Sequence, residues 1–315
     1  MRMGKMWILF LCCFIPFSLW AQGHGGKAGF DFLRLEMGAR PASMGGAFVS
    51  VIGDLHGLMY NPASLVGVRD MEVTFTYLDH FLDIKSGFVG FNKSFNRAGQ
   101  FGMGIMYTNY GELRRTDISG EDLGSFMPGD FVVSATQADS LPWGFRYGVS
   151  VKYIQSSIDQ YTANGFAADL GIIYRIPSQD LNIGLGILNV GAAMNGFVDV
   201  REKLPTSYRL GLSKRLAHLP LLLNFNLIKY QYDESSIFWG LYWALGGEFT
   251  VTENFYLRWG YNSRGSEEKV RVDSDRFAGI SLGLGIRYRK YRLDYGHCSY
   301  GVLGIMNYFT VTISF

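Results

Sequence analysis

Strict alternation of apolar residues with small or polar residues dominates the sequence from about residue 71 to the end. It runs, for example, through 147–153, 280–288 and 309–315. A period of two residues predicts β-strands with two unlike faces. The second face is mostly Gly, Ser, Thr and Asn, and glycine supplies 40 of the 315 residues. In a transmembrane barrel the apolar face meets lipid and small polar residues line the lumen. The pattern therefore predicts an all-β transmembrane barrel rather than a soluble sandwich.

About fourteen alternating segments can be placed along the chain, each followed by a turn or a loop. They are 71–78, 84–95, 98–108, 130–137, 143–155, 163–175, 181–190, 206–215, 220–230, 239–251, 255–262, 277–288, 291–297 and 305–315. Every second connection has five residues or fewer, and the others are mostly longer. Short periplasmic turns and long extracellular loops are typical of outer-membrane barrels, whose closure leaves no unpaired backbone group in lipid. We expect 71–315 to form an antiparallel barrel of about 14 strands in the cell outer membrane.

The first 21 residues have the layout of a secretory signal peptide. Arg2 and Lys5 precede an apolar run over 6–17, and Ala21 offers a small residue before a cut. The alternative is a single membrane anchor. Cleavage leaves Cys298 as the one cysteine, and it removes two of the 29 Lys and Arg against 27 Asp and Glu. The mature chain is then neutral, which argues against a nucleic-acid partner.

Residues 22–70 lack the strand pattern and are too few for a second barrel. Their aromatic and methionine residues, such as Phe30, Phe32 and Met44, disfavour the alternative of a disordered periplasmic tail. Asp54 can cap a short helix-like turn that ends near 60–63. We predict that 22–70 is a plug, or hatch, inside the lumen.

The strand phase also predicts which side chains face inward. Val149, Val151, Leu210, Leu212, Phe225 and Val311 are expected to face lipid, and Ser150, Gly211, Asn226 and Thr310 to face the lumen. The charged residues expected to face the lumen are Lys152, Arg175, Arg209, Glu248, Arg258, Arg287 and Asp294. We interpret these charges as neutralising one another and anchoring the plug; the alternative is a path for a solute or peptide. The lumen face otherwise reads as poor in apolar side chains.

No motif indicates an enzyme. The match to G-x-S-x-G at 279–283 lies within unbroken alternation, whereas a nucleophile elbow needs a sharp strand-to-helix turn. The histidines are scattered without metal-ligand spacing, and Asp54 with His56 reads as an ordinary polar turn. The sequence predicts no catalytic, cofactor-binding or metal site.

Several segments resemble the PorV/PorQ family. The resemblance rests on Phe-Leu-Arg-Leu at 32–35, Gly-Ala-Arg-Pro-Ala-Ser-Met-Gly-Gly-Ala-Phe at 38–48, Asn-Pro-Ala at 61–63, Glu-Lys-Leu-Pro at 202–205 and Arg-Trp-Gly-Tyr-Asn at 258–262. It implies a FadL-like barrel of the type IX secretion machinery, or a related barrel. The modest length and Arg-Glu-Lys-Leu-Pro at 201–205 lean toward the PorQ branch, whereas the opening at 38–46 is as similar to the uncharacterised members of the family. Within the plug, the residues that carry the motif are Arg40, Pro41, Gly45, Gly46, Asn61 and Pro62.

Two functions from different classes follow from this resemblance. The first is a cargo-docking or attachment platform for type IX secretion, acting through loops such as 109–129, 191–205 and 263–276. Its partners would be outer-membrane lipid and other secretion-complex proteins or secreted cargo. The second is a FadL-like transporter of hydrophobic solutes, which needs an apolar pocket inside the barrel. A lumen poor in apolar side chains favours the first.

Overall fold

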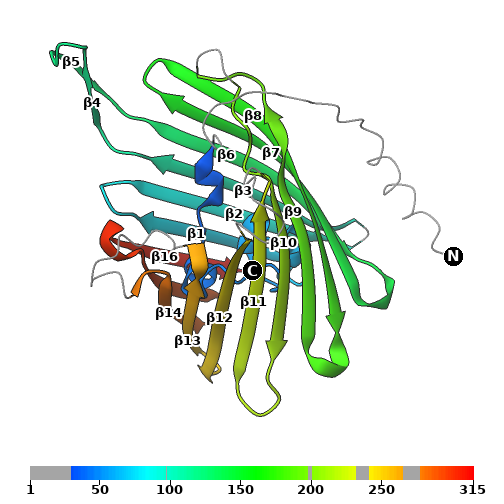
Figure 1. Ribbon diagram of the computed structural model, residues 1–315. Helices are drawn as coiled ribbons and strands as arrows, with labels where there is room; N and C mark the ends of the chain where they lie inside the picture. The colour runs from blue at the N-terminus through cyan, green and yellow to red at the C-terminus, as the bar shows by residue number, and fades with distance from the viewer. Residues whose placement is uncertain (1–29, 97, 198–200, 232–240, 265–276) are drawn as a thin grey trace.

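Fourteen antiparallel strands close into a barrel in the computed structural model, which describes residues 30–96, 98–197, 201–231, 241–264 and 277–315 (Figure 1). The barrel closes where β1 (Met71–Asp79) pairs with β16 (Ile305–Ser314), with Phe75 opposite Val311. This confirms the predicted fold class and strand number. The predicted signal peptide, 1–21, lies outside the described residues.

The strands follow one another around the barrel in chain order. The remaining barrel strands are β2 (Lys85–Phe95), β3 (Gly99–Asn109), β6 (Gly129–Ser140), β7 (Phe145–Ile158), β8 (Tyr161–Ile176), β9 (Leu181–Ala193), β10 (Ser207–Arg215), β11 (Leu221–Tyr230), β12 (Leu241–Thr252), β13 (Phe255–Asn262), β14 (Ile280–Tyr288) and β15 (Tyr291–Ser299). The predicted segments agree with these bounds to within three residues at either end. Period-two patterning located the strands because each one has two chemically different faces.

The two ends of the barrel differ. At the short-turn end lie the turns β2–β3, β6–β7, β8–β9, β10–β11, β12–β13 and β14–β15; the opposite end is the long-loop end. Within the loop expected over 109–129, β4 (Leu113–Thr116) and β5 (Asp122–Phe126) form a separate two-stranded hairpin that projects from the barrel (Figure 1). Sequence patterning missed it because both faces of β4 are exposed. Short 3-10 turns lie at Pro142–Gly144 (η4), Pro177–Gln179 (η5) and Gly301–Leu303 (η7).

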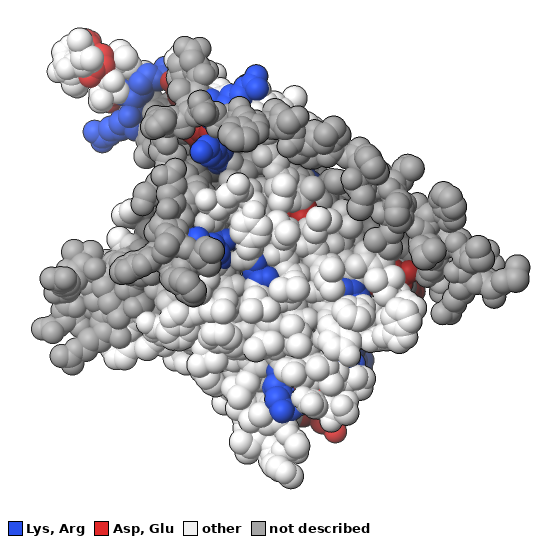
Figure 2. Space-filling view, turned by 45° about the vertical axis from the view of Figure 1, so that its right-hand side comes forward, with Lys and Arg blue, Asp and Glu red and all other residues white. Residues whose placement is uncertain are grey.

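The outer surface of the barrel is apolar. In β3 exposed and buried residues alternate, and Phe101, Met103, Ile105 and Tyr107 face outward. The predicted orientation is confirmed at Val151, Leu210 and Leu212, which are exposed, and at Ser150 and Thr310, which are buried. Charged residues occupy only small separate spots on the face shown in Figure 2. A closed barrel with an apolar outer wall matches the bilayer interior, and the protein is an outer-membrane β-barrel.

An arginine in place of Val151 tests this outer surface. We expect Val151→Arg to destabilise the barrel by ~2–4 kcal/mol, because an arginine on the lipid face near the bilayer midplane has that cost. The matched control is Ile118→Arg, at an equally apolar and fully exposed residue of the β4–β5 hairpin, outside the barrel wall. Urea unfolding in lipid vesicles measures both, and equal losses would contradict the assignment of Val151 to the lipid face.

Residues 30–70, which we call the N-terminal segment, lie inside the barrel (Figure 1). The segment forms η1 (Asp31–Arg34), α2 (Ala39–Ser43), η2 (Leu55–Met59) and η3 (Pro62–Leu65). Helix α2 contacts β13 to β16, η2 contacts β1 to β3, and η3 contacts β6 to β8. No helix among the described residues is long and apolar enough to cross a membrane.

The N-terminal segment extends along the lumen from one end of the barrel to the other. Near its start, the Arg34 guanidinium lies 4.4 Å from the ring centre of Tyr230, at the long-loop end of β11. Near its finish, the Arg69 carbonyl accepts a hydrogen bond from Asn92 at the short-turn end of β2. Asp54 caps η2 by accepting the His56 N–H, which confirms its predicted capping role.

Candidate functional site

Glycines on the inner wall let the backbone of the N-terminal segment approach the strands closely. A Cβ added to Gly148 of β7 would lie 2.3 Å from the Pro62 carbonyl carbon, and one added to Gly246 of β12 would lie 2.4 Å from the Met44 carbonyl oxygen. Real Cβ atoms do not approach other atoms so closely, so any larger residue would push the segment away from the wall. The high glycine content of the strands therefore has a packing reason.

Gly148→Ala is expected to destabilise the protein by ~1–3 kcal/mol, because the extra methyl group overpacks a filled interface. Gly186 of β9 provides the matched control: it is also buried and faces inward, but the nearest atom to an added Cβ lies 3.8 Å away. Gly186→Ala should therefore change stability little. Thermal unfolding of both variants measures the difference, and equal losses would show that the close approach at Gly148 does not limit packing.

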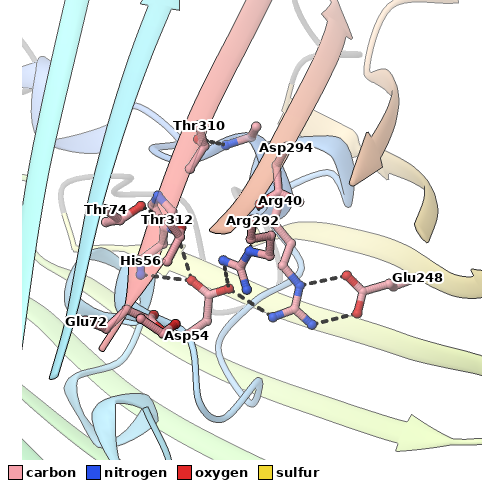
Figure 3. A network of polar contacts seen from close by, with 12 residues as sticks. Arg40, Asp54, His56, Glu72, Thr74, Glu248, Arg292, Asp294, Thr310 and Thr312 are labelled. Atoms are coloured by element: carbon pink, nitrogen blue, oxygen red, sulfur yellow. Dashed lines mark hydrogen bonds and ion pairs between the residues drawn. The ribbon is translucent and has the colours of Figure 1, made fainter. Parts of the chain in front are cut away.

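Six charged side chains form a closed ring of ion pairs inside the lumen, which we call the charge ring. In order they are Arg40, Glu248, Arg258, Asp294, Arg292 and Asp54. Figure 3 labels five of them, including Arg40 between Glu248 and Asp54. Cations and anions alternate, so the three positive and three negative charges balance. Arg40 and Asp54 come from the N-terminal segment, and the other four come from β12, β13 and β15.

Each neighbouring pair in the charge ring is in direct contact. Arg40 binds Glu248 through two hydrogen bonds, Nε to Oε2 and Nη2 to Oε1, both 2.7 Å long, and its Nη1 lies 2.9 Å from Asp54 Oδ2. Arg258 reaches Glu248 and Asp294, each at 2.7 Å. Arg292 reaches Asp294 at 2.8 Å and Asp54 at 2.9 Å. Such charge-assisted, partly bidentate contacts bind the N-terminal segment to the wall.

A second polar chain ties Asp54 to the neighbouring strands β1 and β16. His56 Nδ1 lies 2.9 Å from Asp54 Oδ1, and His56 Nε2 lies 3.0 Å from Thr76 Oγ1. Thr76 Oγ1 lies 2.8 Å from Thr310 Oγ1, which accepts the Ala39 N–H. One order satisfies every donor: Thr310 donates to Thr76, Thr76 donates to Nε2, and Nδ1–H donates to Asp54. This order assigns the ring hydrogen of His56 to Nδ1.

The other charged residues expected to face the lumen lie in three different environments. Lys152 is buried and pairs with Asp169 at 2.7 Å, and Arg209 is buried with its Nε 3.1 Å from Ser207 Oγ. Arg175 is half exposed at the short-turn end and lies 3.7 Å from Asp180. Arg287 lies beside the Tyr256 ring, also near that end. The strand neighbour of Arg287 is Arg292, while Asp294 binds Arg258 and Arg292.

The residues of the family-like motif occupy the contacts between the N-terminal segment and the wall. Arg40 is in the charge ring, and Pro41 lies in the first turn of α2. Gly45 and Gly46 follow α2 with φ of 65° and 76°, a backbone conformation that favours glycine.

Asn61 and Pro62 of this motif place η3 against β7 to β9. Asn61 caps η3 by accepting the Ala63 N–H, and it donates to the Leu185 carbonyl oxygen of β9 at 3.2 Å. Pro62, at the first position of η3, lies against Gly148.

Sequence reasoning underrated three residues. Asp54 and His56 read as an ordinary polar turn, but both are fully buried and Asp54 joins two arginines. The other residues that Asp54 and His56 contact are distant in sequence, so no local sequence pattern could predict these contacts. Arg292 was missing from the lumen-facing charges, although it has the same strand phase as Asp294, and that phase could have identified it.

The expectation of a lumen poor in apolar side chains is wrong at the long-loop end. Leu78, Phe88, Met106, Val132 and Ile154 face inward there, with at most 2% of their surface exposed. They form one cluster with apolar residues of the N-terminal segment, namely Phe30, Phe32, Leu33 and Met37. We call these nine residues the apolar wall cluster. Toward the short-turn end, by contrast, the inner wall holds the charge ring and hydroxyl or amide side chains such as Thr312 and Asn224.

Comparison with solved structures shows a FadL-like fold. The toluene transporter TodX of Pseudomonas putida aligns with a TM-score of 0.56 and 13% identity, over 88% of this chain and 96% of that one. The toluene transporter TbuX of Ralstonia pickettii gives 0.54 and 12%, over 88% and 97%. A FadL homologue of Pseudomonas aeruginosa gives 0.53 and 10%, over 88% and 97%. Two of these three neighbours are described as transporters.

No family model matches the chain, and no curated protein matches it. The similarity to FadL-like channels is therefore a similarity of fold, and the resemblance to the PorV/PorQ family rests on the sequence motifs alone.

Proposed function

We propose that the protein passes small hydrophobic molecules across the outer membrane. The observation that carries the proposal is the apolar wall cluster at the long-loop end of a FadL-like barrel. Transfer of a hydrophobic molecule from water to such a surface is favourable by roughly 25 cal/mol per Å² of buried apolar area. Solved neighbours described as toluene transporters have the same fold, which supports this class of solute.

We further propose that the N-terminal segment closes the straight path through the lumen. A solute that enters at the long-loop end meets Phe30, which precedes η1, and Phe32 within η1, and both belong to the apolar wall cluster. Below them lies the charge ring, which a hydrocarbon cannot pass favourably because its members are bound to one another and give it no apolar surface. Passage therefore requires movement of η1 and an exit above the charge ring.

Uptake of radiolabelled toluene into proteoliposomes tests the proposal. Wild-type protein should accelerate uptake over empty liposomes, and Phe88→Asp should reduce the initial rate at least about tenfold, because a carboxylate replaces apolar wall. Phe88→Leu is the matched control and should retain most of the rate. Heat-modifiable migration on gels confirms that each variant is folded. Uptake by wild-type protein no faster than by empty liposomes would refute the proposal.

A second candidate function, docking of proteins in type IX secretion, is favoured by the β4–β5 hairpin. The hairpin projects from the barrel (Figure 1). The apolar residues Ile118, Leu123 and Met127, in and beside it, are exposed, as are the cations Arg114 and Arg115. Of the other proposed docking loops, most of 263–276 and part of 191–205 lie outside the described residues. Pull-down from solubilised membranes should recover secretion proteins with the wild-type chain and fewer with Ile118→Asp/Leu123→Asp. Recovery of the same proteins with both would exclude the hairpin as a docking surface.

A further inference from the structure

A cavity of about 220 Å³ lies at the short-turn end, between the end of the N-terminal segment and the strands β14 to β16. Gly53, Gly67 and Arg69 contribute the side formed by the segment. The opposite side comes from the β14–β15 turn and its flanks, with Arg287, Arg289, Lys290 and Arg292. The volume exceeds that of several water molecules, so the cavity can hold a small polar group and its first atoms of attachment.

The lining of this cavity is strongly basic. Arg69, Arg287, Arg289, Lys290 and Arg292 line it against a single lining carboxylate, Glu72. Within the described parts of the chain, Arg292 is paired in the charge ring, but the other four cations form no ion pair. The Glu72 carboxylate accepts a hydrogen bond from the Ser314 hydroxyl, with 2.7 Å between Oγ and Oε2.

Three of these four cations lie against aromatic rings, which hold the side chains near the cavity without neutralising them. Arg287 lies 5.7 Å from the ring centre of Tyr256 and Arg289 lies 5.4 Å from that of Tyr288. Lys290 Nζ lies 5.5 Å from the ring centre of Tyr291 and 5.1 Å from that of Phe315. Cation–π contacts orient a cation but leave its full charge for an anion. The cavity is therefore a site of uncompensated positive charge that an anion would stabilise.

The position of the cavity indicates the kind of anion. Tyr288, Tyr291 and Phe315 are exposed on the outer surface around the same turn. Exposed aromatic rings at the rim of a membrane barrel sit at the level of the lipid headgroups. The cations therefore lie at the depth of lipid phosphates. Planar guanidinium groups match phosphate oxygens, and several of them together suit a phosphate better than a single carboxylate.

We propose that this cavity is a phosphate-binding site, filled by the phosphate of a membrane lipid or by free phosphate. A bound phosphate joins Arg69 of the N-terminal segment to the β14–β15 turn, and so fastens the end of the segment to the wall. Arg292 connects the site to the charge ring, because its Nη2 binds Asp54 and its Nε binds Asp294. Occupancy of the site thus stabilises the inserted position of the segment.

Native mass spectrometry of the detergent-purified protein tests whether the cavity binds a lipid phosphate. The ligand is phosphatidylglycerol, and the phosphate-free control is the diacylglycerol with the same acyl chains. Calorimetric titration with inorganic phosphate tests whether free phosphate binds. The variant Arg289→Gln/Lys290→Gln removes two exposed cations of the cavity. Lys214→Gln/Arg215→Gln removes two exposed cations at the same end of the barrel but outside the cavity. Heat-modifiable migration verifies folding, and Arg69→Gln/Arg287→Gln replaces the first variant if that one does not assemble.

Phosphatidylglycerol is expected to bind in preference to diacylglycerol, and the cavity variant should weaken binding about tenfold or more, since two charge-assisted contacts are lost. The control variant should change binding less than about twofold, because exposed charges outside the site are screened. Binding of inorganic phosphate alone, lost in the cavity variant, would support the site and identify free phosphate as the source. Binding of neither ligand, or an equal loss in cavity and control variants, would overturn the proposal.

Discussion

Glu248→Gln is expected to destabilise the folded barrel by ~3–5 kcal/mol, the cost of breaking a buried ion pair from one side. Glu248 is 5% exposed and bridges Arg40 of the N-terminal segment and Arg258 of β13. Glutamine retains the size of the side chain and one acceptor oxygen, but it leaves the charge ring with three cations and two anions. The excess positive charge is buried, and no carboxylate is left to offset the free-energy cost of its desolvation. Urea unfolding in lipid vesicles measures the loss.

Two comparisons separate this effect from a general loss of charge. Glu253→Gln removes a carboxylate from the exposed turn after β12 and should cost less than about 1 kcal/mol. The double variant Glu248→Leu/Arg258→Leu restores the balance, leaving Arg40, Arg292, Asp54 and Asp294, and should be more stable than Glu248→Leu alone. A double-mutant cycle reports the coupling energy. Strictly additive losses, or equal losses at Glu248 and Glu253, would show that the ring does not act as a unit.

The fold could be predicted from sequence because each strand carries its orientation in its own residues. Alternation through 147–153 identified β7 and also assigned Val151 to the lipid side and Ser150 to the lumen. About fourteen such strands in a membrane must close into an antiparallel barrel, because every backbone polar group in lipid needs a hydrogen-bond partner within the protein. The structural comparisons confirm the FadL-like fold, whereas the type IX role stays a prediction from motif resemblance.

The charge ring could be predicted only in part, because it joins residues that are far apart in the chain. Strand phase placed Glu248, Arg258 and Asp294 on the inner wall, and phase alone would also have found Arg292. Asp54 sits in an irregular turn, so nothing in its neighbours indicated that it meets Arg40 and Arg292. Contacts of this kind depend on how the N-terminal segment is threaded through the barrel, which no periodicity encodes.

The apolar wall cluster had a sequence signal that strand patterning overlooked. Alternation breaks where two apolar residues adjoin near the long-loop end of a strand, as at Ile105 and Met106 or Val132 and Val133. In each pair one residue faces lipid and the other faces the lumen. Taken singly, each break looks like the end of the strand. Several breaks on neighbouring strands, all at the same end of the barrel, indicate an apolar inner wall.

Deletion of residues 30–66 is expected to convert a closed barrel into an open, ion-conducting channel. The interior of a barrel widens with strand number, and inward glycine, serine and threonine side chains are too small to fill one of fourteen strands. The N-terminal segment supplies the missing volume, with Phe48, Leu55 and Leu58 fully buried inside. Without it, water fills the lumen as in a porin. Planar-bilayer recording should show little steady conductance for the intact protein and large, stable conductance for the deletion variant.

The deletion variant has a physical reason to assemble. It removes Arg40 and Asp54 together, so the charge ring loses one cation and one anion, and Arg258 and Arg292 keep their contacts with Glu248 and Asp294. A milder variant, Arg40→Gln/Asp54→Asn, keeps the segment and the charge balance but weakens its attachment, and brief openings are expected instead of a stable channel. Intact protein that conducts as strongly as the deletion variant would show that the N-terminal segment does not close the lumen. Hydrophobic solutes would then have a water-filled path through the barrel, and no movement of η1 would be needed.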